Sequence, residues 1–406
     1  MSVARVVEGL LVVAFLFEVV GCVLVAGRAP GSPLEPNMAA GALLALLPVV
    51  YAGIVIIKHC GRVVAKARLE TLYPNEPNRR LNYRVKFGDQ SWQLVVHVLL
   101  SALAYFILRV EDGGVAWLDD HTSLWLPEAI GGTAGIFANR SRPSVHLLYL
   151  LQAAAWIVTA VSHVWLEERH KDYLMMLVHH VVTLALILLS YHFNFVKLGV
   201  VIMFLHDSSD IVIDLLKLCN YLNLEGISGL FAVEACFITN FVTWAYARLY
   251  VFPVHVIWKG VIVASREIAT APGAPGMEAF SAAAGHNGHH DAHTRGHAPG
   301  YSVPRDVAQG KFDLLANIRA LPTHECIPMW WTASGFLCAL LVMNLVWYLM
   351  FWNILYKMVT ASDSCNEVTE KTYEGDREKV KPATAPRPLP SSTKKPATKK
   401  ATIKRD

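Results

Sequence analysis

Ionisable side chains lie inside two long apolar stretches near the middle of the chain, within residues 170–221. His179 and His180 are adjacent in the first stretch. The second stretch contains four more ionisable residues: His206, Asp207, Asp210 and Asp214. An ionisable group at bilayer depth costs several kcal/mol unless it faces a polar cavity and has partners. The presence of six such groups therefore indicates a functional site.

Two neighbouring histidines point in directions about 100° apart around a helix. One imidazole can therefore face a reactive cavity while a carboxylate holds the other. This arrangement suits nucleophilic or general-base catalysis, in which one ring reacts and the second moves protons. It suits a metal site built from histidine and aspartate nearly as well.

The two stretches are predicted to form an antiparallel pair of helices with a turn near residues 192–197. At a rise of about 1.5 Å per residue, the histidine pair lies roughly 9–11 Å from one end, and Asp210 roughly 13 Å from the same end. Asp210 is therefore the carboxylate expected beside the histidines. Lys217 is expected to neutralise Asp214, three residues before it. One polar face of the second helix holds four residues: Asp207, Asp210, Asp214 and Lys217.

Other histidines have simpler explanations. His97 and His163 lie in predicted spans, where a single histidine usually packs or forms one hydrogen bond between helices. A further run lies in a segment rich in Gly and Ala, where we favour no metal binding: His286, His289, His290, His293 and His297.

The composition predicts an all-α polytopic membrane protein. Hydrophobic residues make up 54% of the 406 residues and charged residues only 17%. The apolar residues come in runs of about 20, the length that crosses a bilayer. About eight spans are predicted: 5–26, 39–57, 92–110, 145–166, 174–192, 196–218, 226–251 and 330–357. The formal charge of +4 gives no reason to expect nucleic acid as a partner, and none of the seven cysteines forms a CxxC pair.

Basic residues predict the orientation of the spans. Segment 58–91 is strongly basic and is expected in the cytosol, whereas the acidic loop 111–144, with its sequon at Asn139, is expected in the lumen. Both outer ends of residues 170–221 are then cytosolic. Three parts are predicted: N-terminal helices with the basic segment (1–82), a core (83–358) with a low-complexity luminal segment (265–310), and a basic tail (359–406). The low-complexity segment and the tail are expected to be disordered.

The central stretch resembles the signature region of ceramide synthases, which belong to the TLC-domain family. The motifs that match are Lys171-Asp172-Tyr173, His179-His180-Val181, Leu205-His206-Asp207-Ser208-Ser209-Asp210 and Asn220-Tyr221. The resemblance implies six core helices around a central cavity that opens to the cytosol, in the endoplasmic reticulum membrane. It also implies transfer of a fatty acyl group from acyl-CoA to the amine of a sphingoid base, which makes (dihydro)ceramide. No metal and no cofactor beyond the acyl-CoA substrate are expected, and the chain could form a homo- or heterodimer.

The resemblance also implies roles for single residues. His179 would take the acyl group, and His180, paired with Asp210, would act as the general base. His206 and Asp207 would shape or polarise the site. The residues expected to contact substrate, including the CoA phosphates at the cytosolic mouth, are Arg169, Lys171, Lys86, Arg84, Asp214 and Lys217.

Two other functions fit parts of the sequence. A divalent-metal transporter would also place His and Asp within the membrane, but the polar residues here lie on two helices and do not trace a path across. A non-catalytic TLC relative, which senses lipid or associates with the translocon, would share the fold. Such relatives tend to lack the full set of paired histidines and His-Asp-x-Ser-Asp, so acyl transfer is the favoured function.

Overall fold

The computed structural model describes residues 3–28, 36–111, 118–119, 121–124, 142–165, 173–192, 195–265, 329–361 and 368. All regular structure within these residues is helical, as the composition predicts. The sequon at Asn139 lies outside the described residues. So does nearly all of the two segments expected to be disordered.

Long helices make up most of the described chain. They are α1 Val3–Arg28, α2 Pro36–Leu72, α3 Pro77–Phe106, α4 Pro143–Trp165, α5 Tyr173–His192, α6 Val196–Tyr221, α7 Ala232–Trp244 and α12 Trp330–Ala361. Helix α7 continues directly into a π-helical segment, η6 Ala245–Val263. The shorter segments are η1 Ile107–Glu111, which continues α3, η3 His121–Leu124 and η5 Ile227–Gly229.

Several of these helices have the length and composition of membrane spans. Five are apolar enough to cross a bilayer: α2, α3 with η1, α4, α5 and α12. Helix α1 is also apolar, including its part Leu10–Gly21. The α6 and α7–η6 helices carry ionisable residues in their middle portions, which lowers their apolar character. The protein is therefore a multi-pass membrane protein. A described helix overlaps each of the eight predicted spans, but the number that cross, and the central cavity, stay predictions.

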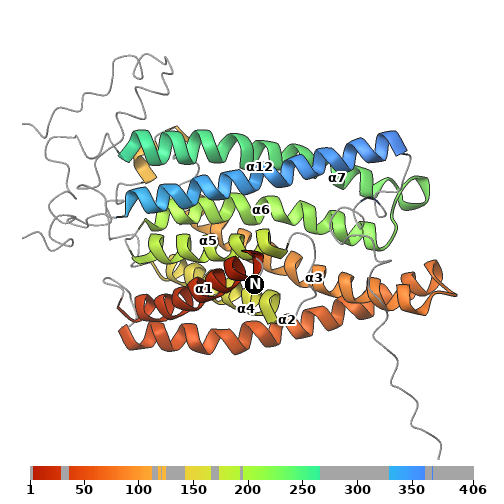
Figure 1. Ribbon diagram of the computed structural model, residues 1–406, viewed down its shortest axis with the longest axis horizontal. Coiled ribbons are helices and arrows are strands. Elements are labelled where there is room, and N and C mark those ends of the chain that lie inside the picture. The colour runs from red at the N-terminus through yellow and green to blue at the C-terminus, as the bar shows by residue number, and fades with distance from the viewer. Residues whose placement is uncertain are drawn as a thin grey trace, which may run out of the picture.

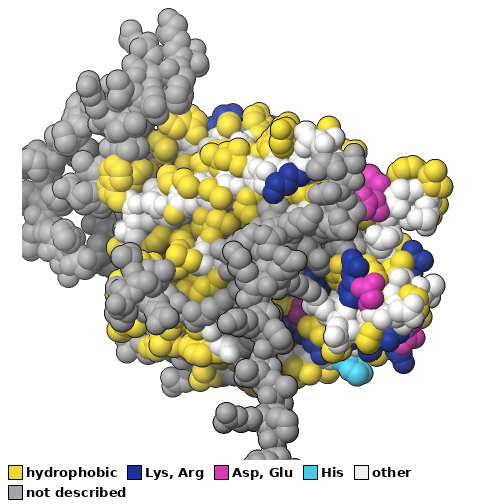
Figure 2. Space-filling view, turned by 45° about the vertical axis from the view of Figure 1, so that its right-hand side comes forward, with side chains coloured by type: hydrophobic (Ala, Val, Ile, Leu, Met, Phe, Trp, Pro, Cys, Tyr) yellow, Lys and Arg dark blue, Asp and Glu magenta, His cyan; other side chains and the backbone are white. Residues whose placement is uncertain are grey.

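The helices lie side by side along the long axis of the molecule (Figure 1). Helix α6 lies in the interior of the bundle and packs against α3, α5, α7 and η6. Hydrophobic side chains cover much of the surface, and charged side chains gather toward the end that contains the α2–α3 turn (Figure 2). This end is the one that the basic residues of segment 58–91 assign to the cytosol.

Helices α2 and α3 approach closely because glycine occupies both sides of their crossing. A Cβ atom on Gly88 would lie 2.6 Å from the carbonyl oxygen of Lys58, and one on Gly61 would lie 2.5 Å from the hydroxyl of Ser91. Across the same crossing, the Lys58 ammonium lies 3.1 Å from the carboxylate of Asp89. Small residues at helix crossings in membranes allow such close backbone contact.

The projecting ends of α2 and α3 also brace the end of α6. The ring of Tyr83 is fully buried and lies 5.4 Å from that of Tyr73 and 6.2 Å from that of Tyr221 on α6. The Arg68 guanidinium donates a hydrogen bond to the carbonyl oxygen of Leu222 at 3.4 Å. These contacts help to position α6, which carries most of the candidate site.

We expect Gly88→Ala to lower the melting temperature of the detergent-solubilised protein, because the new methyl group would meet a backbone oxygen that cannot rotate away. Overpacking of this kind costs about 1–3 kcal/mol. The matched control is Gly53→Ala on α2, where a Cβ would meet nothing within 4 Å. This control should be neutral, or stabilising by up to about 1 kcal/mol from helix propensity. Equal melting temperatures for the two variants would contradict the close crossing.

Candidate functional site

The two adjacent histidines lie on α5 and share one neighbour, Trp156, while each also has a neighbour of its own: Trp347 for His179 and His163 for His180. The ring centroids of His179 and His180 are 6.2 Å apart with planes tilted by 43°. The His180 side chain is buried at 6% exposure, whereas His179 is only partly buried. The divergence expected for neighbouring positions on a helix is therefore confirmed.

Tryptophan side chains hold both imidazoles. The Trp156 ring on α4 lies 5.1 Å from that of His179 and 5.4 Å from that of His180, in edge-to-face contacts. Trp347 on α12 lies 5.2 Å from His179 with the planes at 90°. The hydroxyl of Thr183 lies 3.4 Å from Nδ1 of His179. His179 thus sits between tryptophans from two helices.

Three carboxylates on α6 each bind a different neighbouring helix. Asp207 accepts a hydrogen bond from the Gln152 amide on α4 at 2.5 Å. Asp210 forms an ion pair with Arg248 on η6, with Nη2 and Oδ1 2.5 Å apart. Asp214 lies 2.7 Å from Nδ1 of His97 on α3. The spacing of three and four residues spreads these groups across one broad face of the helix.

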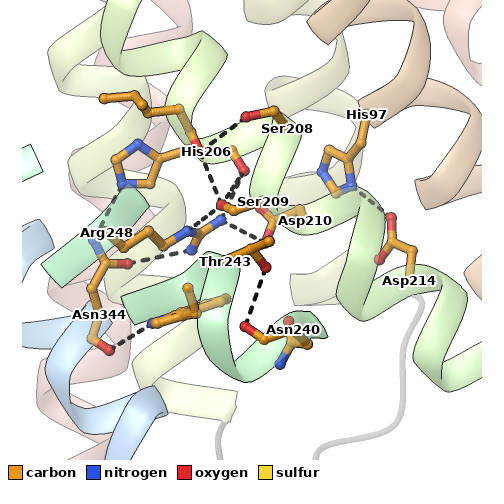
Figure 3. A network of polar contacts seen from close by, with 12 residues as sticks. His97, His206, Ser208, Ser209, Asp210, Asp214, Asn240, Thr243, Arg248 and Asn344 are labelled. Atoms are coloured by element: carbon orange, nitrogen blue, oxygen red, sulfur yellow. Dashed lines mark hydrogen bonds and ion pairs between the residues drawn. The ribbon is translucent and has the colours of Figure 1, made fainter. Parts of the chain in front are cut away.

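Arg248 is almost fully buried and every one of its guanidinium nitrogens has a partner (Figure 3). Besides Asp210 it binds the Ser209 hydroxyl at 2.7 Å, the His206 carbonyl oxygen at 2.9 Å and the Asn344 amide oxygen at 3.3 Å. It also lies 3.9 Å from the centroid of the Trp244 ring. We call this group the Arg248 cluster: Arg248, Asp210, Ser209, His206, Asn344 and Trp244. It joins α6, α7–η6 and α12.

The structure corrects the expected partner of Asp210. Depth along the helices predicted a direct pair with His180, but the ion pair of Asp210 among the described residues is with Arg248. The reason is that depth fixes only the position along the axis, whereas the direction of the side chain around α6 turns Asp210 toward η6. It is Asp207 that is linked to the histidines, through Gln152 and Trp156.

His206 is held as a neutral imidazole by its two partners. The Asn344 amide oxygen accepts from Arg248, so its nitrogen is the atom that lies 3.2 Å from Nε2 of His206 and donates to it. Nδ1 must then carry the proton and donate to the Ile202 carbonyl oxygen at 2.9 Å. Both ring nitrogens of His206 are thus engaged by partners within the bundle.

The carboxylate of Asp214 takes its direct partners from α3. The Gln90 amide donates to Oδ1, and His97 binds Oδ2. The charge of Lys217, which is partly exposed at the end of α6, acts on Asp214 as expected, while the direct partners of the carboxylate are Gln90 and His97. His97, expected to pack or to form one hydrogen bond between helices, forms such a contact with Asp214.

Two of the residues expected to contact substrate, Arg84 and Lys86, lie in the first half of α3. Arg84 donates to the Arg62 carbonyl oxygen at 3.3 Å, and the Lys86 ammonium lies 5.5 Å from the centroid of the Tyr83 ring. Lys86 precedes His97 by roughly 16 Å along α3, so this pair lies toward the charged end of the bundle. Arg169 and Lys171 lie outside the described residues. In the part of the chain that is described, no three His, Cys, Asp or Glu side chains could together hold a metal ion.

Sequence reasoning missed several residues of the site. They are Gln152, Trp156, Gln90, Asn344, Trp347, Trp244 and Arg248. Gln152 and Asn344 are polar residues within apolar helices, the same signal that identified the histidines. The tryptophans gave no signal, because an apolar span often contains them.

We expect Arg248→Met to destabilise the protein by about 3–5 kcal/mol, because it leaves the Asp210 carboxylate in the bundle without its cation. The double variant Arg248→Met with Asp210→Leu should recover much of this loss, since it removes the unpaired charge as well. Thermal unfolding in detergent measures both. A double variant less stable than Arg248→Met alone would contradict the ion pair as the source of the effect.

Comparison with known proteins identifies the family to which the protein belongs. The sequence model of the TLC domain matches residues 86–353, about two thirds of the chain. The chain is 30% identical over 174 residues to ASC1-like protein 3 of Oryza sativa subsp. japonica, a match that covers 43% of this chain and 55% of that protein. It is 37% identical over 119 residues to ceramide synthase 1 of Mus musculus, covering 28% and 34%.

A third relative, ceramide synthase 1 LOH3 of Arabidopsis thaliana, is 27% identical over 174 residues, covering 43% of this chain and 53% of its own length. The chain thus matches between about a third and about half of the length of these relatives. The TLC-domain match, in contrast, includes most of the described core, from α3 to α12. The protein belongs to the TLC-domain family, and the relatives it resembles there include ceramide synthases.

Proposed function

We propose that the protein transfers a fatty acyl group from acyl-CoA to the amine of a sphingoid base and so makes (dihydro)ceramide. The observation that carries the proposal is the histidine pair inside the helical bundle. One imidazole is partly exposed and the other is buried, and both contact tryptophan rings. The ceramide synthases among its relatives supply the substrate class.

In the first step His179 attacks the thioester. Its ring is the more exposed of the two, and its Nδ1 lies beside the Thr183 hydroxyl, so we assign the attack to Nε2. A bond forms between Nε2 and the carbonyl carbon, the carbon–sulfur bond breaks, and CoA leaves as the thiolate. Imidazole attacks acyl groups well and leaves well, which makes an acyl-imidazole a reasonable intermediate.

In the second step the neutral amine of the sphingoid base attacks the acyl carbon. The bond from carbon to Nε2 breaks, and the amine nitrogen loses a proton. We assign His180 as the general base that takes this proton, since it is buried beside His179 and shares the Trp156 contact. His180 then gives this proton up, and the CoA thiolate gains one, so the products are the amide and the CoA thiol and both imidazoles are neutral again.

The acidic residues then support the reaction without touching the acyl group. In this proposal Asp210 keeps the Arg248 guanidinium in place, so that the Arg248 cluster holds α6, η6 and α12 together and positions Trp347 beside His179. Asp207 and His206 shape the site. Asp214 and Lys217, together with Lys86, Arg84, Arg169 and Lys171, are proposed substrate contacts, and the basic members suit the CoA phosphates. We assign the protein to the endoplasmic reticulum membrane, with a homo- or heterodimer as a possible form.

The second candidate is a non-catalytic relative with the same fold that senses lipid or associates with the translocon. This candidate function would not depend on how the two imidazole rings are oriented. A divalent-metal transporter is a third and would require that Asp207 or Asp210 contact a transported ion. The ion pair of Asp210 with Arg248 disfavours that role, because a guanidinium competes with a cation for the carboxylate.

The chain should restore ceramide when it is expressed in cells that lack endogenous sphingoid-base N-acylation, and His179→Ala should abolish the product because it removes the nucleophile. The measurement is a full lipid profile, which also reports acyl-chain length. No ceramide from the wild-type chain at normal expression would favour the non-catalytic candidate. Metal uptake that depends on Asp207 would favour the transporter.

We expect His180→Gln to slow turnover by about 10²–10⁴-fold, since it removes the general base, while His179 can still be acylated. Incubation with a fatty acyl-CoA alone should then leave an acyl adduct on His179, detected by mass spectrometry of the peptide 172–197. His179→Ala should give no adduct, and His192→Gln, at the exposed end of the same helix, should behave as wild type. An adduct on His180 would reverse the two roles.

A further inference from the structure

We infer that Gln152 and Trp156 of α4 are positioning residues that connect the Asp207 carboxylate to the two imidazoles. The inference rests on the proposed acyl transfer, because it explains what fixes the ring orientations that this reaction needs. It assigns Asp207 the role of an anchor that acts through α4.

Two hydrogen bonds fix the Gln152 amide in one orientation. Its nitrogen donates to Asp207 at 2.5 Å, and its oxygen accepts from the indole nitrogen of Trp156 at 3.0 Å. A flipped amide would set its oxygen against the carboxylate and its nitrogen against the indole N–H, so both bonds would be lost. Gln152 is only 1% exposed, so water cannot replace either bond. The position of the carboxylate therefore determines the position of the indole.

The indole in turn sets the angle between the imidazoles. The centroid of Trp156 lies 5.1 Å and 5.4 Å from those of His179 and His180, closer to each than they are to one another at 6.2 Å. Each contact is edge-to-face, with planes at 78° and 68°. A ring in contact with both histidines at these angles limits how either can turn. A small misplacement of a reacting group can reduce a rate by about a hundredfold.

The contacts of Asp207 agree with an anchoring role. Its side chain is 4% exposed, and its hydrogen-bond partner among the described residues is the Gln152 amide. A carboxylate that exchanged protons with the substrate would need access to it. An anchor needs only to accept one hydrogen bond, which an amide oxygen can also do.

Trp156→Phe tests the link, because it removes the indole N–H but keeps an aromatic ring and leaves the bond between Gln152 and Asp207 in place. We expect kcat to fall by about 10- to 100-fold with KM little changed, a shifted pH profile of kcat, and a melting temperature close to that of the wild type. The matched control is Trp165→Phe, at a side chain 54% exposed on the same helix, which should leave all of these unchanged. An unaltered kcat and pH profile in Trp156→Phe would overturn the inference, as would a loss explained entirely by unfolding.

Substitutions of Asp207 distinguish an anchor from a proton carrier. Asp207→Asn should keep at least about a tenth of wild-type kcat because its amide oxygen can accept from Gln152, whereas Asp207→Leu should lose about as much as Gln152→Leu. If Asp207→Asn were as inactive as Asp207→Leu, the carboxylate itself would be required and the anchor role would be wrong.

Chemical modification tests the positioning without any substrate. Diethyl pyrocarbonate acylates neutral imidazoles, and mass spectrometry of the peptide 172–197 reports His179 and His180 separately, with His192 as an internal reference. We expect Trp156→Phe to change the ratio of modification of the two histidines by about threefold or more, and Trp165→Phe to leave it unchanged. A changed ratio in a protein that makes no ceramide would overturn the proposed reaction only. An unchanged ratio in an active enzyme would overturn the positioning role only.

Discussion

The need to satisfy the carboxylates inside the bundle determines how the helices around α6 are arranged. Asp207, Asp210 and Asp214 lie on one face of α6, and each takes its partner from a different neighbour: α4, η6 and α3. A carboxylate inside an apolar bundle is tolerated only when it is paired or hydrogen-bonded. Each contact therefore fixes the rotation and axial position of one helix relative to α6. Sliding any of these helices by one turn would leave a charge unpaired.

The Arg248 cluster extends this constraint to α12. The guanidinium binds Asn344 while the indole of Trp244 donates to the Asn344 carbonyl oxygen at 3.1 Å. This places α12 so that Trp347 reaches His179. The histidine pair is thus held from α4 and from α12 by aromatic rings, and both helices are in turn fixed by polar contacts that lead back to α6.

The sequence by itself determined the helical class, the membrane character and the stretch that holds the site, because apolar runs of span length and ionisable residues inside them are properties of composition and spacing alone. It also determined which residues are adjacent on α5 and which share a face of α6. Only the tertiary structure decided which groups are partners: Asp210 with Arg248, Asp207 with Gln152, and Asp214 with His97. The physical reason is that periodicity gives the height and the face of a residue on its own helix, whereas partners depend on how neighbouring helices are rotated and packed. Tryptophans that are unremarkable in an apolar span became part of the site for the same reason.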